Sequence, residues 1–600
     1  LAVLVLGTVA ACAPAPEPAD LVITGGRIVT MDPDRPEVEA IAARGQELIA
    51  AGSADEVAEL IGDATEVIEL DGALAVPGLI EGHGHFAGLG RSKMILDLTT
   101  VASFDEIVDM VAAAVSEADE GEWIMGRGWH QEKWSAIPEP NVSGLPYHDR
   151  MSEVSPANPG VLVHASGHAS LVNAAALEIA GIGDDTPDPD GGEIVRDAGG
   201  RAIGVLRETA EELVAAHHAD EPDEATVRRM IELATRECLA NGITSFHDAG
   251  SSFSLVELLG SMAEEGELGL RLWVMLSEDN ESLAAKLPGY RVHRVGGGYL
   301  TVGGIKRWVD GALGSHGAWL LEPYTDLPTS TGLNIVTVEE LTETARLALE
   351  HDLQLCSHAI GDRANRVTID VYEAAYETVP EPRDLRWRVE HAQHLHPDDI
   401  ARFSELGIVA AMQPTHCTSD GPWVPVRLGD ERARTGAYVW RDLFETGAVI
   451  ASGTDVPVEP VDTMPSFHAA VTRKMADGSA FYPAQVMTRM EALRARTMGA
   501  AFAAFEDDVK GSLEVGKFAD VTVLSRDILE IPEEADAVSL GLSVFGIETP
   551  GRFSWGRPGT VQVEPYTESW LRVRNMLARH AVLYLSADYQ EAVIESQVEA

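Results

Sequence analysis

The stretch Gly-Leu-Ile-Glu-Gly-His-Gly-His-Phe, residues 78–86, decides the fold that this sequence predicts. Apolar and small residues lead into two histidines spaced i and i+2. On an extended strand, side chains with that spacing point to the same side. We therefore expect His83 and His85 to project together from the end of a buried strand, spaced to hold one metal ion. Gly82 and Gly84 are expected to leave room beside them. Two histidines near a strand end are also ordinary polar residues, so the rest of the chain has to decide.

Apolar strand-like runs alternate with helical stretches through most of the chain, which is the pattern of βα units around a parallel sheet. The candidate strands are residues 78–83, 243–248, 271–276, 304–310, 353–358, 386–391, 408–413 and 448–453. Eight parallel strands close naturally into a (β/α)8 barrel, in which the chemistry lies at the carboxyl ends of the strands. The predicted fold class is therefore α/β, a TIM-like barrel.

The remaining segments predict additions to this barrel. Residues 20–76 and 505–562 contain short β-rich runs with turns, which predicts a small β-sandwich built from both chain ends. Within the barrel, residues 77–504, the segment of about 100–240 is too long for one crossover and is expected to cover the barrel mouth. Residues 563–600 include apolar residues at roughly helical spacing and predict a helical tail that packs on the body.

The first 19 residues have the features of an export leader and tether. Residues 1–11 are apolar, too few to span a bilayer as a helix, and resemble the hydrophobic part of a secretion signal. Residues 9–12 resemble a bacterial lipoprotein cleavage box ending in Cys12, and residues 13–18 resemble a tether. We expect an exported protein, periplasmic or lipid-anchored to the bacterial envelope. The alternative is a plain signal peptide with an incidental cysteine.

The composition limits the partners. Acidic residues outnumber basic ones 96 to 44, which gives a formal charge of -52. This argues against nucleic acid, whose phosphates need Lys and Arg. A strongly solvated acidic surface and an adaptation to high salt both explain the charge. We expect a small-molecule substrate and membrane contact only through the N-terminal anchor; a homo-oligomer is left open. Cysteines other than Cys12 predict no disulfide framework.

Four further candidate strands carry residues that can bind metal at or near their ends. They are Lys306, His358, His391 and Asp455. Imidazole and carboxylate ligands suit zinc and similar divalent ions. A single histidine on a strand is usually a satisfied buried polar group. Histidines at strand ends one, five and six, together with an aspartate at eight, predict a metal site.

This ligand set resembles that of the amidohydrolase superfamily. The residues that carry the resemblance are His83, His85, Lys306, His358, His391 and Asp455, with the motifs at 76–85, 306–311, 358–362, 390–393, 413–420 and 453–459. They are similar to the branch that contains N-substituted formamide deformylase, over residues 20–562. The resemblance implies the barrel with its β-sandwich, one or two divalent ions with zinc expected first, and hydrolysis of C–N bonds. Gly84 departs from the family pattern, which is expected to loosen the pocket floor.

Lys306 has two interpretations. In related enzymes a buried lysine reacts with carbon dioxide to give a carbamate that bridges two metals, and burial favours the neutral amine that this requires. The alternative is an ammonium paired with Asp310 or Asp362. We favour the carbamate.

The expected reaction uses a metal-activated water with Asp455 as the general base, which then protonates the leaving amine. Residues of the insertion and the seventh loop that are candidates for substrate contact are Trp129, His168, Asn173, Glu208 and His416. Each has a structural alternative: Trp129 as core, Asn173 as a helix cap, Glu208 as a partner of Arg207. Asp362 is expected to orient a metal-bound histidine rather than to act in catalysis.

Two other functions remain open at this stage. A deaminase or an ester or lactone hydrolase would use the same metal chemistry, because fold does not settle substrate. From a different class, the chain could be an exported binding protein with a decayed site. The intact Asp455 and the full ligand set argue against that second alternative.

Overall fold

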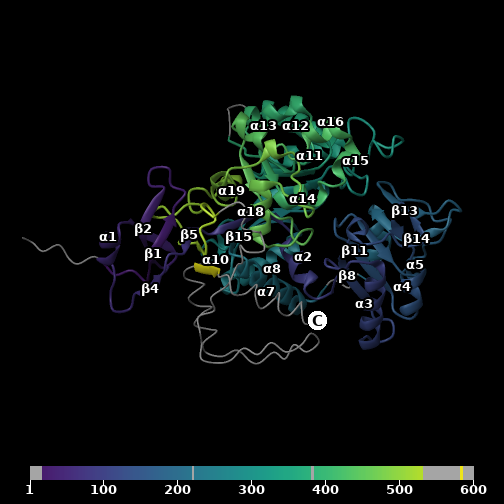
Figure 1. The fold of residues 1–600 in the computed structure, drawn as a ribbon, viewed down its shortest axis with the longest axis horizontal. Helices are drawn as coiled ribbons and strands as arrows, with labels where there is room; N and C mark the ends of the chain where they lie inside the picture. The colour runs from purple at the N-terminus through teal and green to yellow at the C-terminus, as the bar shows by residue number, and fades with distance from the viewer. Residues whose placement is uncertain (1–16, 219–221, 380–383, 532–581, 586–600) are drawn as a thin grey trace, which may run out of the picture.

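The computed structural model describes residues 17–218, 222–379, 384–531 and 582–585. Figure 1 shows a central helical and sheet region, with a β domain made from the N-terminal strands at one end and an inserted α/β domain at the other. The chain passes from the first through the centre to the insertion and then returns to the centre. This arrangement places the predicted barrel between the two smaller parts.

The eight predicted barrel strands are present and form one parallel sheet. They are β6 (Leu79–Gly84), β15 (Ile243–Ser251), β16 (Arg271–Leu276), β17 (Leu300–Trp308), β18 (Gln354–Ala359), β19 (Arg388–His391), β20 (Val409–Met412) and β21 (Ile450–Ser452). They are neighbours in the order in which they follow one another along the chain, from β6 to β21. The last strand returns beside the first, because the Asp455 N–H donates to the His83 carbonyl at 2.8 Å. The TIM-like barrel is therefore confirmed.

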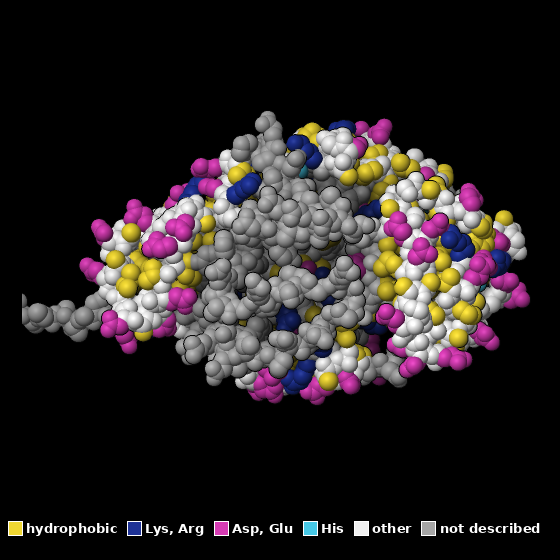
Figure 2. Space-filling model, turned by 60° about the horizontal axis from the view of Figure 1, so that its bottom comes forward, with side chains coloured by type: hydrophobic (Ala, Val, Ile, Leu, Met, Phe, Trp, Pro, Cys, Tyr) yellow, Lys and Arg dark blue, Asp and Glu magenta, His cyan; other side chains and the backbone are white. Residues whose placement is uncertain are grey.

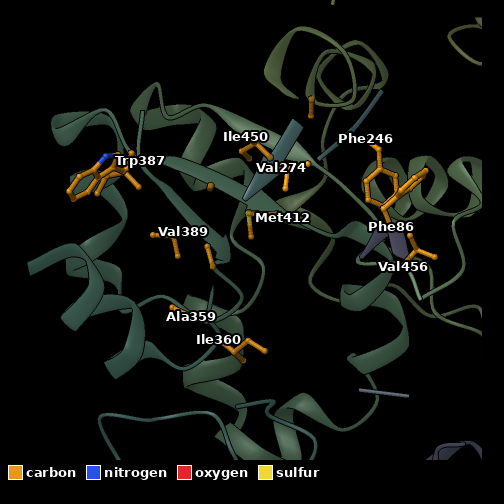
Figure 3. Packing of buried hydrophobic residues seen from close by; sticks show 14 of the residues in the cluster. Phe86, Phe246, Val274, Ala359, Ile360, Trp387, Val389, Met412, Ile450 and Val456 are labelled. Atoms are coloured by element: carbon orange, nitrogen blue, oxygen red, sulfur yellow. The ribbon is translucent and has the colours of Figure 1, made fainter. Parts of the chain in front are cut away.

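The barrel is built from strands that are buried on both faces. Every residue of β16 and of β18 is buried, which is why β16 appears in the sequence, after Arg271, as a continuous rather than alternating apolar run. Figure 3 shows side chains from several strands, including Val274, Val389, Met412 and Ile450, in this packing. A strand that is apolar on both faces needs helices outside it and side chains within the barrel.

Helices cover the outside of the barrel. They are α2 (Phe86–Ser92), α7 (Glu224–Ala240), α8 (Phe253–Glu264), α9 (Asn280–Lys286), α10 (Val295–Gly298), α11 (Val338–Glu350), α12 (Asp362–Glu377), α13 (Pro397–Leu406), α14 (Pro414–Asp420), α15 (Val424–Leu428), α16 (Asp430–Gly436), α17 (Trp440–Thr446), α18 (Thr463–Thr472), α19 (Arg489–Ala495) and α20 (Met498–Ala503). In α11, Thr337 and Glu340 form a capping box, and Leu341, Ala345 and Ala348 lie on the buried face.

The insertion is a separate α/β domain with its own sheet. Its elements are β7 (Leu96–Asp97), α3 (Phe104–Glu117), β8 (Ile124–Trp129), β9 (Asn141–Val142), β10 (Leu145–Pro146), α4 (Asp149–Val154), β11 (Gly160–His164), β12 (Ala169–Val172), α5 (Ala174–Ala180), β13 (Gly192–Arg196), β14 (Ala202–Glu208) and α6 (Glu212–His218). Six strands pair in the order β13-β14-β12-β11-β8-β7. The boundary of the insertion that the sequence predicts, near residue 240, lies too far along the chain. Ile231, Ala234 and Cys238 of α7 already pack in the barrel core.

The β domain draws strands from both chain ends, as the sequence predicts. They are β1 (Leu21–Val29), β2 (Glu37–Arg44), β3 (Glu47–Gly52), β4 (Glu66–Glu69), β5 (Leu74–Pro77), β22 (Val521–Leu524) and β23 (Val582–Leu585), with the short helix α1 (Ala54–Ala58). They form one seven-stranded sheet. A register shift between Thr24 and Ile28 lets the two halves of β1 pair with β4 and β5 separately, yet Ile23 and Ile28 share one apolar cluster. The predicted sandwich takes the form of one seven-stranded sheet.

Several predictions concern chain ends. Residues 1–16, with Cys12, lie outside the described residues, as does most of the tail 563–600 with its predicted helix. The described part of that tail, Val582–Leu585, is a strand paired parallel to β22. Among the described residues, no helix is both long and apolar enough to cross a membrane. Cys238, Cys356 and Cys417 are free and buried.

The acidic excess is visible on the surface. Figure 2 shows Asp and Glu side chains scattered over the β domain and the inserted domain, with fewer Lys and Arg side chains between them. On the face in this view, outside the grey residues, they form no single patch that would mark a cationic partner. This distribution agrees with both explanations of the charge, a solvated surface and adaptation to high salt.

Candidate active site

The predicted ligands converge at the carboxyl ends of the barrel strands. The ring centroids of His83 and His391 are 4.7 Å apart, and those of His358 and His391 are 4.5 Å apart. Oδ1 of Asp455 lies 3.5 Å from Nε2 of His83 and 3.2 Å from Nε2 of His85. Residues separated by more than 300 positions along the chain thus share one site, as the barrel interpretation requires.

Two of these residues have unusual backbone conformations. His391 has φ 75° and Asp455 has φ 61°, both in the left-handed region that L-residues rarely occupy. Such a conformation costs on the order of 1–3 kcal/mol, and it persists only where the surroundings impose it. At Asp455 the hydrogen bond from its N–H to the His83 carbonyl, 2.8 Å long, imposes it. Both side chains lie at the barrel mouth with the other candidate ligands.

A buried ion pair orients His83. Nδ1 of His83 contacts the carboxylate of Glu390, which Arg388 also binds at 2.7 Å, and the three side chains are fully buried. Because the carboxylate can only accept, Nδ1 carries the proton and Nε2 faces the site with its lone pair. Burial and the nearby Lys306 lower the pKa of His83 to about 4, so its imidazole is neutral at pH 7.

His391 is held in the same way by Gln413. The amide of Gln413 donates to the Ala411 carbonyl at 3.0 Å, so its Oε1 is left to accept from Nδ1 of His391 at 2.9 Å. Burial holds the pKa of His391 well below its usual value. The imidazole is therefore neutral, with Nε2 free to bind a cation.

Lys306 is buried without a hydrogen-bond partner, and its Nζ lies 5.2 Å from the centroid of the Trp308 ring. Its Nζ has no hydrogen bond among the described residues, and burial lowers its pKa. Asp310 instead accepts backbone N–H groups from Trp319, Ile360 and Gly361, at 2.8 to 2.9 Å. The structure therefore does not support the expected alternative of an ammonium paired with Asp310.

Asp362 also differs from expectation. Its carboxylate accepts the N–H of Leu321 at 2.8 Å and touches no histidine of the site, so it neither pairs with Lys306 nor orients His358. The carboxylate near His358 is that of Asp310, 3.6 Å from Nε2. The positions of the two aspartates explain the difference. Asp362 is the first residue of α12, outside the barrel, whereas Asp310 follows the carboxyl end of β17.

The unsatisfied atoms at this site fit a divalent cation. Nε2 of His83, Nε2 of His358, Nζ of Lys306 and Oδ1 of Asp455 are all buried without a hydrogen-bond partner. Ligand atoms of His83, His391 and Asp455 lie within 4.8 Å of one another. Buried polar groups are normally satisfied, and a cluster of orphaned imidazole and carboxylate atoms is the donor set of a zinc-like ion.

Asp455 lies in a hydrogen-bonded network with the seventh loop. Nε2 of His416 is 3.4 Å from Oδ2 of Asp455, and Nδ1 of His416 is 3.7 Å from Oε1 of Glu459. Burial alone would raise the pKa of Asp455, but the close imidazoles of His416 and His85 outweigh it and hold that pKa well below its usual value. Asp455 is therefore a carboxylate at neutral pH. Burial opposes protonation of His416, yet hydrogen bonds to Asp455 and Glu459 raise its pKa to about 10.

The insertion reaches the site through His168 and Glu208. The ring of His168 lies 5.5 Å from that of His358, and its Nδ1 is 2.9 Å from Oε2 of Glu208. Glu208 has φ 51° and faces the barrel, where a Cβ on Gly311 would lie 2.4 Å from its Oε1. Arg207, the expected partner of Glu208, binds Glu193 at 2.7 Å instead. Of the candidates for substrate contact, His168, Glu208 and His416 therefore lie at the site.

Trp129 and Asn173 do not lie at the site. Trp129 is fully buried in the core of the inserted domain, where its indole donates to the Leu162 carbonyl at 2.7 Å. Asn173 caps α5 by accepting the Ala176 N–H at 3.0 Å, and its amide donates to the Ser155 carbonyl. Trp129 is therefore a core residue and Asn173 a helix cap, which are the structural alternatives that the sequence left open for them.

The two glycines of the first motif do not leave free space. A Cβ on Gly82 would lie 2.6 Å from the Ser452 carbonyl oxygen, and one on Gly84 would lie 2.6 Å from the Phe246 ring. Figure 3 shows Phe246 and Val456 close together at this point. Gly82 therefore permits the close approach of β6 and β21, and Gly84 accommodates a packed floor rather than loosening it.

Sequence reasoning missed the residues that orient the ligands, namely Arg388, Glu390 and Gln413. Arg388 and Glu390 lie two residues apart in β19, and this spacing on a strand places them on one side. A charged pair with that spacing inside a buried strand was the signal that could have found them. Gln413 carries no comparable signal, because a single glutamine after a strand is common.

The parallel barrel and this cluster of histidines and carboxylate define the class of metal-dependent hydrolases. A model of the amidohydrolase family matches residues 66–546. This chain belongs to the amidohydrolase family, which confirms the resemblance identified from its motifs.

Relatives and solved structures agree. Protein LONG AFTER FAR-RED 3 of Arabidopsis thaliana is 35% identical over 526 residues, 85% of this chain and 88% of that protein. N-substituted formamide deformylase of Arthrobacter pascens is 27% identical over 517 residues, 85% of this chain and 94% of that protein. The crystal structure of an uncharacterized metal-dependent hydrolase from Pyrococcus furiosus has a TM-score of 0.66 at 28% identity, covering 85% of this chain and 100% of that one.

Proposed function

We propose that the protein hydrolyses C–N bonds of amide or formamide type, with Asp455 as the general base. The observation that carries this proposal is the ionised, buried carboxylate of Asp455, whose Oδ1 has no partner and lies 3.5 and 3.2 Å from two imidazole nitrogens. The similarity to N-substituted formamide deformylase of Arthrobacter pascens supports the choice of bond.

His83, His85, His358, His391 and Asp455 are the residues that would hold a divalent ion, with zinc as the expected metal. When bound there, such an ion supplies an activated water and polarises the substrate carbonyl. Burial keeps the imidazoles of His83 and His391 neutral, and the acceptors Glu390 and Gln413 hold the proton on Nδ1, so that the Nε2 lone pairs face the site.

Asp455 moves the proton. In the proposed reaction it accepts the proton of the attacking water, whose oxygen forms a bond to the carbonyl carbon. It then gives this proton to the nitrogen as the C–N bond breaks, so that a carboxylic acid and an amine leave. His416 keeps the carboxylate aligned through Oδ2, 3.4 Å from its Nε2, and leaves Oδ1 for the reaction.

The test combines metal analysis with a substrate panel. We expect purified protein to contain zinc or a similar ion and to hydrolyse an N-substituted formamide or an N-acyl amino acid faster than a matched ester. Removal of the metal by a chelator should abolish turnover, and readdition should restore it. Faster hydrolysis of the ester, or deamination without C–N hydrolysis of the amides, would reject the proposal.

We further propose that Lys306 carries a carbamate that helps to hold a second ion. Its buried Nζ, which makes no hydrogen bond, and its lowered pKa favour the neutral amine that adds to carbon dioxide. Lys306→Ala is expected to reduce the metal content from two ions to one. After growth and exchange in 13C-bicarbonate, the wild type should show a carbamate resonance that this variant lacks. Two ions in the variant, or no resonance in the wild type, would contradict the proposal.

A further inference from the structure

Arg127, in β8 of the insertion, has a cationic head without an anionic partner. One Nη of its guanidinium donates to the Ala165 carbonyl at 3.2 Å, while its Nε is buried with no hydrogen bond. Among the described residues, no carboxylate forms an ion pair with it. Other arginines of the same domain are paired: Arg196 with Asp188, Arg201 with Asp149 and Arg207 with Glu193. In a chain with 96 acidic and 44 basic residues, an unpaired arginine is unexpected.

The guanidinium of Arg127 lies beside the segment that carries His168 to the barrel mouth. A Cβ on Gly167 would lie 3.5 Å from both of its Nη atoms, and the next residue, His168, has its ring 5.5 Å from that of His358. The carboxylates of Asp455 and Glu211 are the charges that act on it. Glu211 is engaged by the hydroxyl of Ser170, and Asp455 by His416. Neither neutralises Arg127, so its charge is available to a ligand at the mouth.

A carboxylate is the ligand that this head fits. Burial lowers the pKa of Arg127, but a guanidinium stays protonated in proteins. Its planar fork of N–H donors binds a carboxylate through two parallel hydrogen bonds, and leaving a buried donor unsatisfied carries a desolvation cost. A substrate with a carboxylate at this point removes that cost, whereas a neutral substrate does not.

We propose that Arg127 binds a carboxylate of the substrate, which makes N-formyl or N-acyl amino acids the substrate class in preference to neutral N-substituted amides. The reaction in this statement rests on the proposed function, but the binding does not. Arg127 acts here as a specificity-determining residue on the insertion, beside the segment that carries His168 to the site.

The test uses acid and amide pairs that differ only in charge. The probes are N-formylglycine with N-formylglycinamide, and N-acetyl-L-phenylalanine with its carboxamide. Dissociation constants are measured by calorimetry on the zinc-loaded Asp455→Asn protein, in which turnover is expected to be strongly slowed, and kcat/KM is measured on the otherwise native protein. We expect each acid to bind about 10- to 100-fold more tightly than its amide, the range for a hydrogen bond to a charged group.

Variants assign this preference to Arg127. Arg127→Met should bring the acid down to the affinity of its amide and leave the amide unchanged. Arg127→Lys should keep part of the preference, because it retains the charge but loses the fork. Arg201→Met is the matched control, an arginine of the same domain paired at the surface with Asp149, and it should change neither affinity. If Arg127→Met also loses affinity for the amide, the Arg127→Lys variant becomes the deciding test. An undiminished preference for the acid in Arg127→Lys would overturn the proposal.

The outcomes separate this proposal from the reaction. Equal affinity for acid and amide, a preference that survives Arg127→Met, or no binding of any probe would overturn the role of Arg127. An acid preference without turnover in the native protein would keep that role and reject C–N hydrolysis. Turnover of both members of a pair at equal kcat/KM would support C–N hydrolysis and reject the role of Arg127.

Discussion

Asp455→Asn is expected to lower kcat by about 10²- to 10⁴-fold, the usual contribution of a general acid–base group. The amide of Asn cannot accept the proton of the attacking water or deliver it to the leaving nitrogen. Much of the metal should remain bound, since the histidine ligands His83, His85, His358 and His391 are untouched. Steady-state kinetics on the substrate chosen from the panel, with metal content by mass spectrometry, measures both quantities.

The control is an aspartate outside the barrel mouth. Asp442, on α17, accepts a hydrogen bond from Gln485 at 2.8 Å, and Asp442→Asn should leave kcat within about twofold, as for most substitutions away from special features. A wild-type kcat in Asp455→Asn would refute the role of Asp455 as base. Complete loss of metal from this variant would assign the residue to metal binding instead and leave the base unidentified.

The sequence predicted the strands, and candidate ligands that converge in the structure, because both depend on local patterns. Runs of apolar residues at the eight barrel strands follow from burial on both faces, and a histidine or aspartate after such a run is visible in any single sequence. Closure of the barrel then places residues as distant as His83 and Asp455 together, because carboxyl ends of parallel strands share one rim. The barrel is therefore a prediction from periodicity and topology, without knowledge of any contact.

What surrounds the ligands could not be predicted in this way. Glu390 orients His83, and Asp310 rather than Asp362 lies beside His358, through contacts between elements far apart in the sequence. Residue type alone also failed to separate His168, which reaches the site, from Trp129, which supports the insertion core. Trp129 ends β8 and His168 lies between β11 and β12 of the same domain, and only the packing of that domain on the barrel distinguishes them.

Glu390→Gln is expected to destabilise the barrel by about 3–5 kcal/mol, because it leaves the buried Arg388 without its compensating charge. Glu390 is fully buried, and hydrogen bonds and charges from Arg388 and His83 outweigh burial to keep the pKa of its carboxyl far below the usual value. The glutamine amide can also donate, so the tautomer of His83 is no longer fixed, and metal affinity should fall about 10- to 100-fold. Urea unfolding followed by the fluorescence of Trp273, whose ring lies 5.2 Å from the Arg388 guanidinium carbon, reports the first effect.

Two comparisons isolate the buried charge as the cause. Glu193→Gln removes a carboxylate paired with Arg207 at the surface, and it should cost less than about 1 kcal/mol, as exposed ion pairs do. In the double variant Arg388→Met with Glu390→Gln, no unpaired charge is left, so its loss of stability should be smaller than the sum of the two single losses. Additive losses, or a cost for Glu390→Gln as small as that for Glu193→Gln, would show that the ion pair does not hold His83. In that case Gln413 and the strained backbone of His391 would be left as the features that fix the ligand geometry.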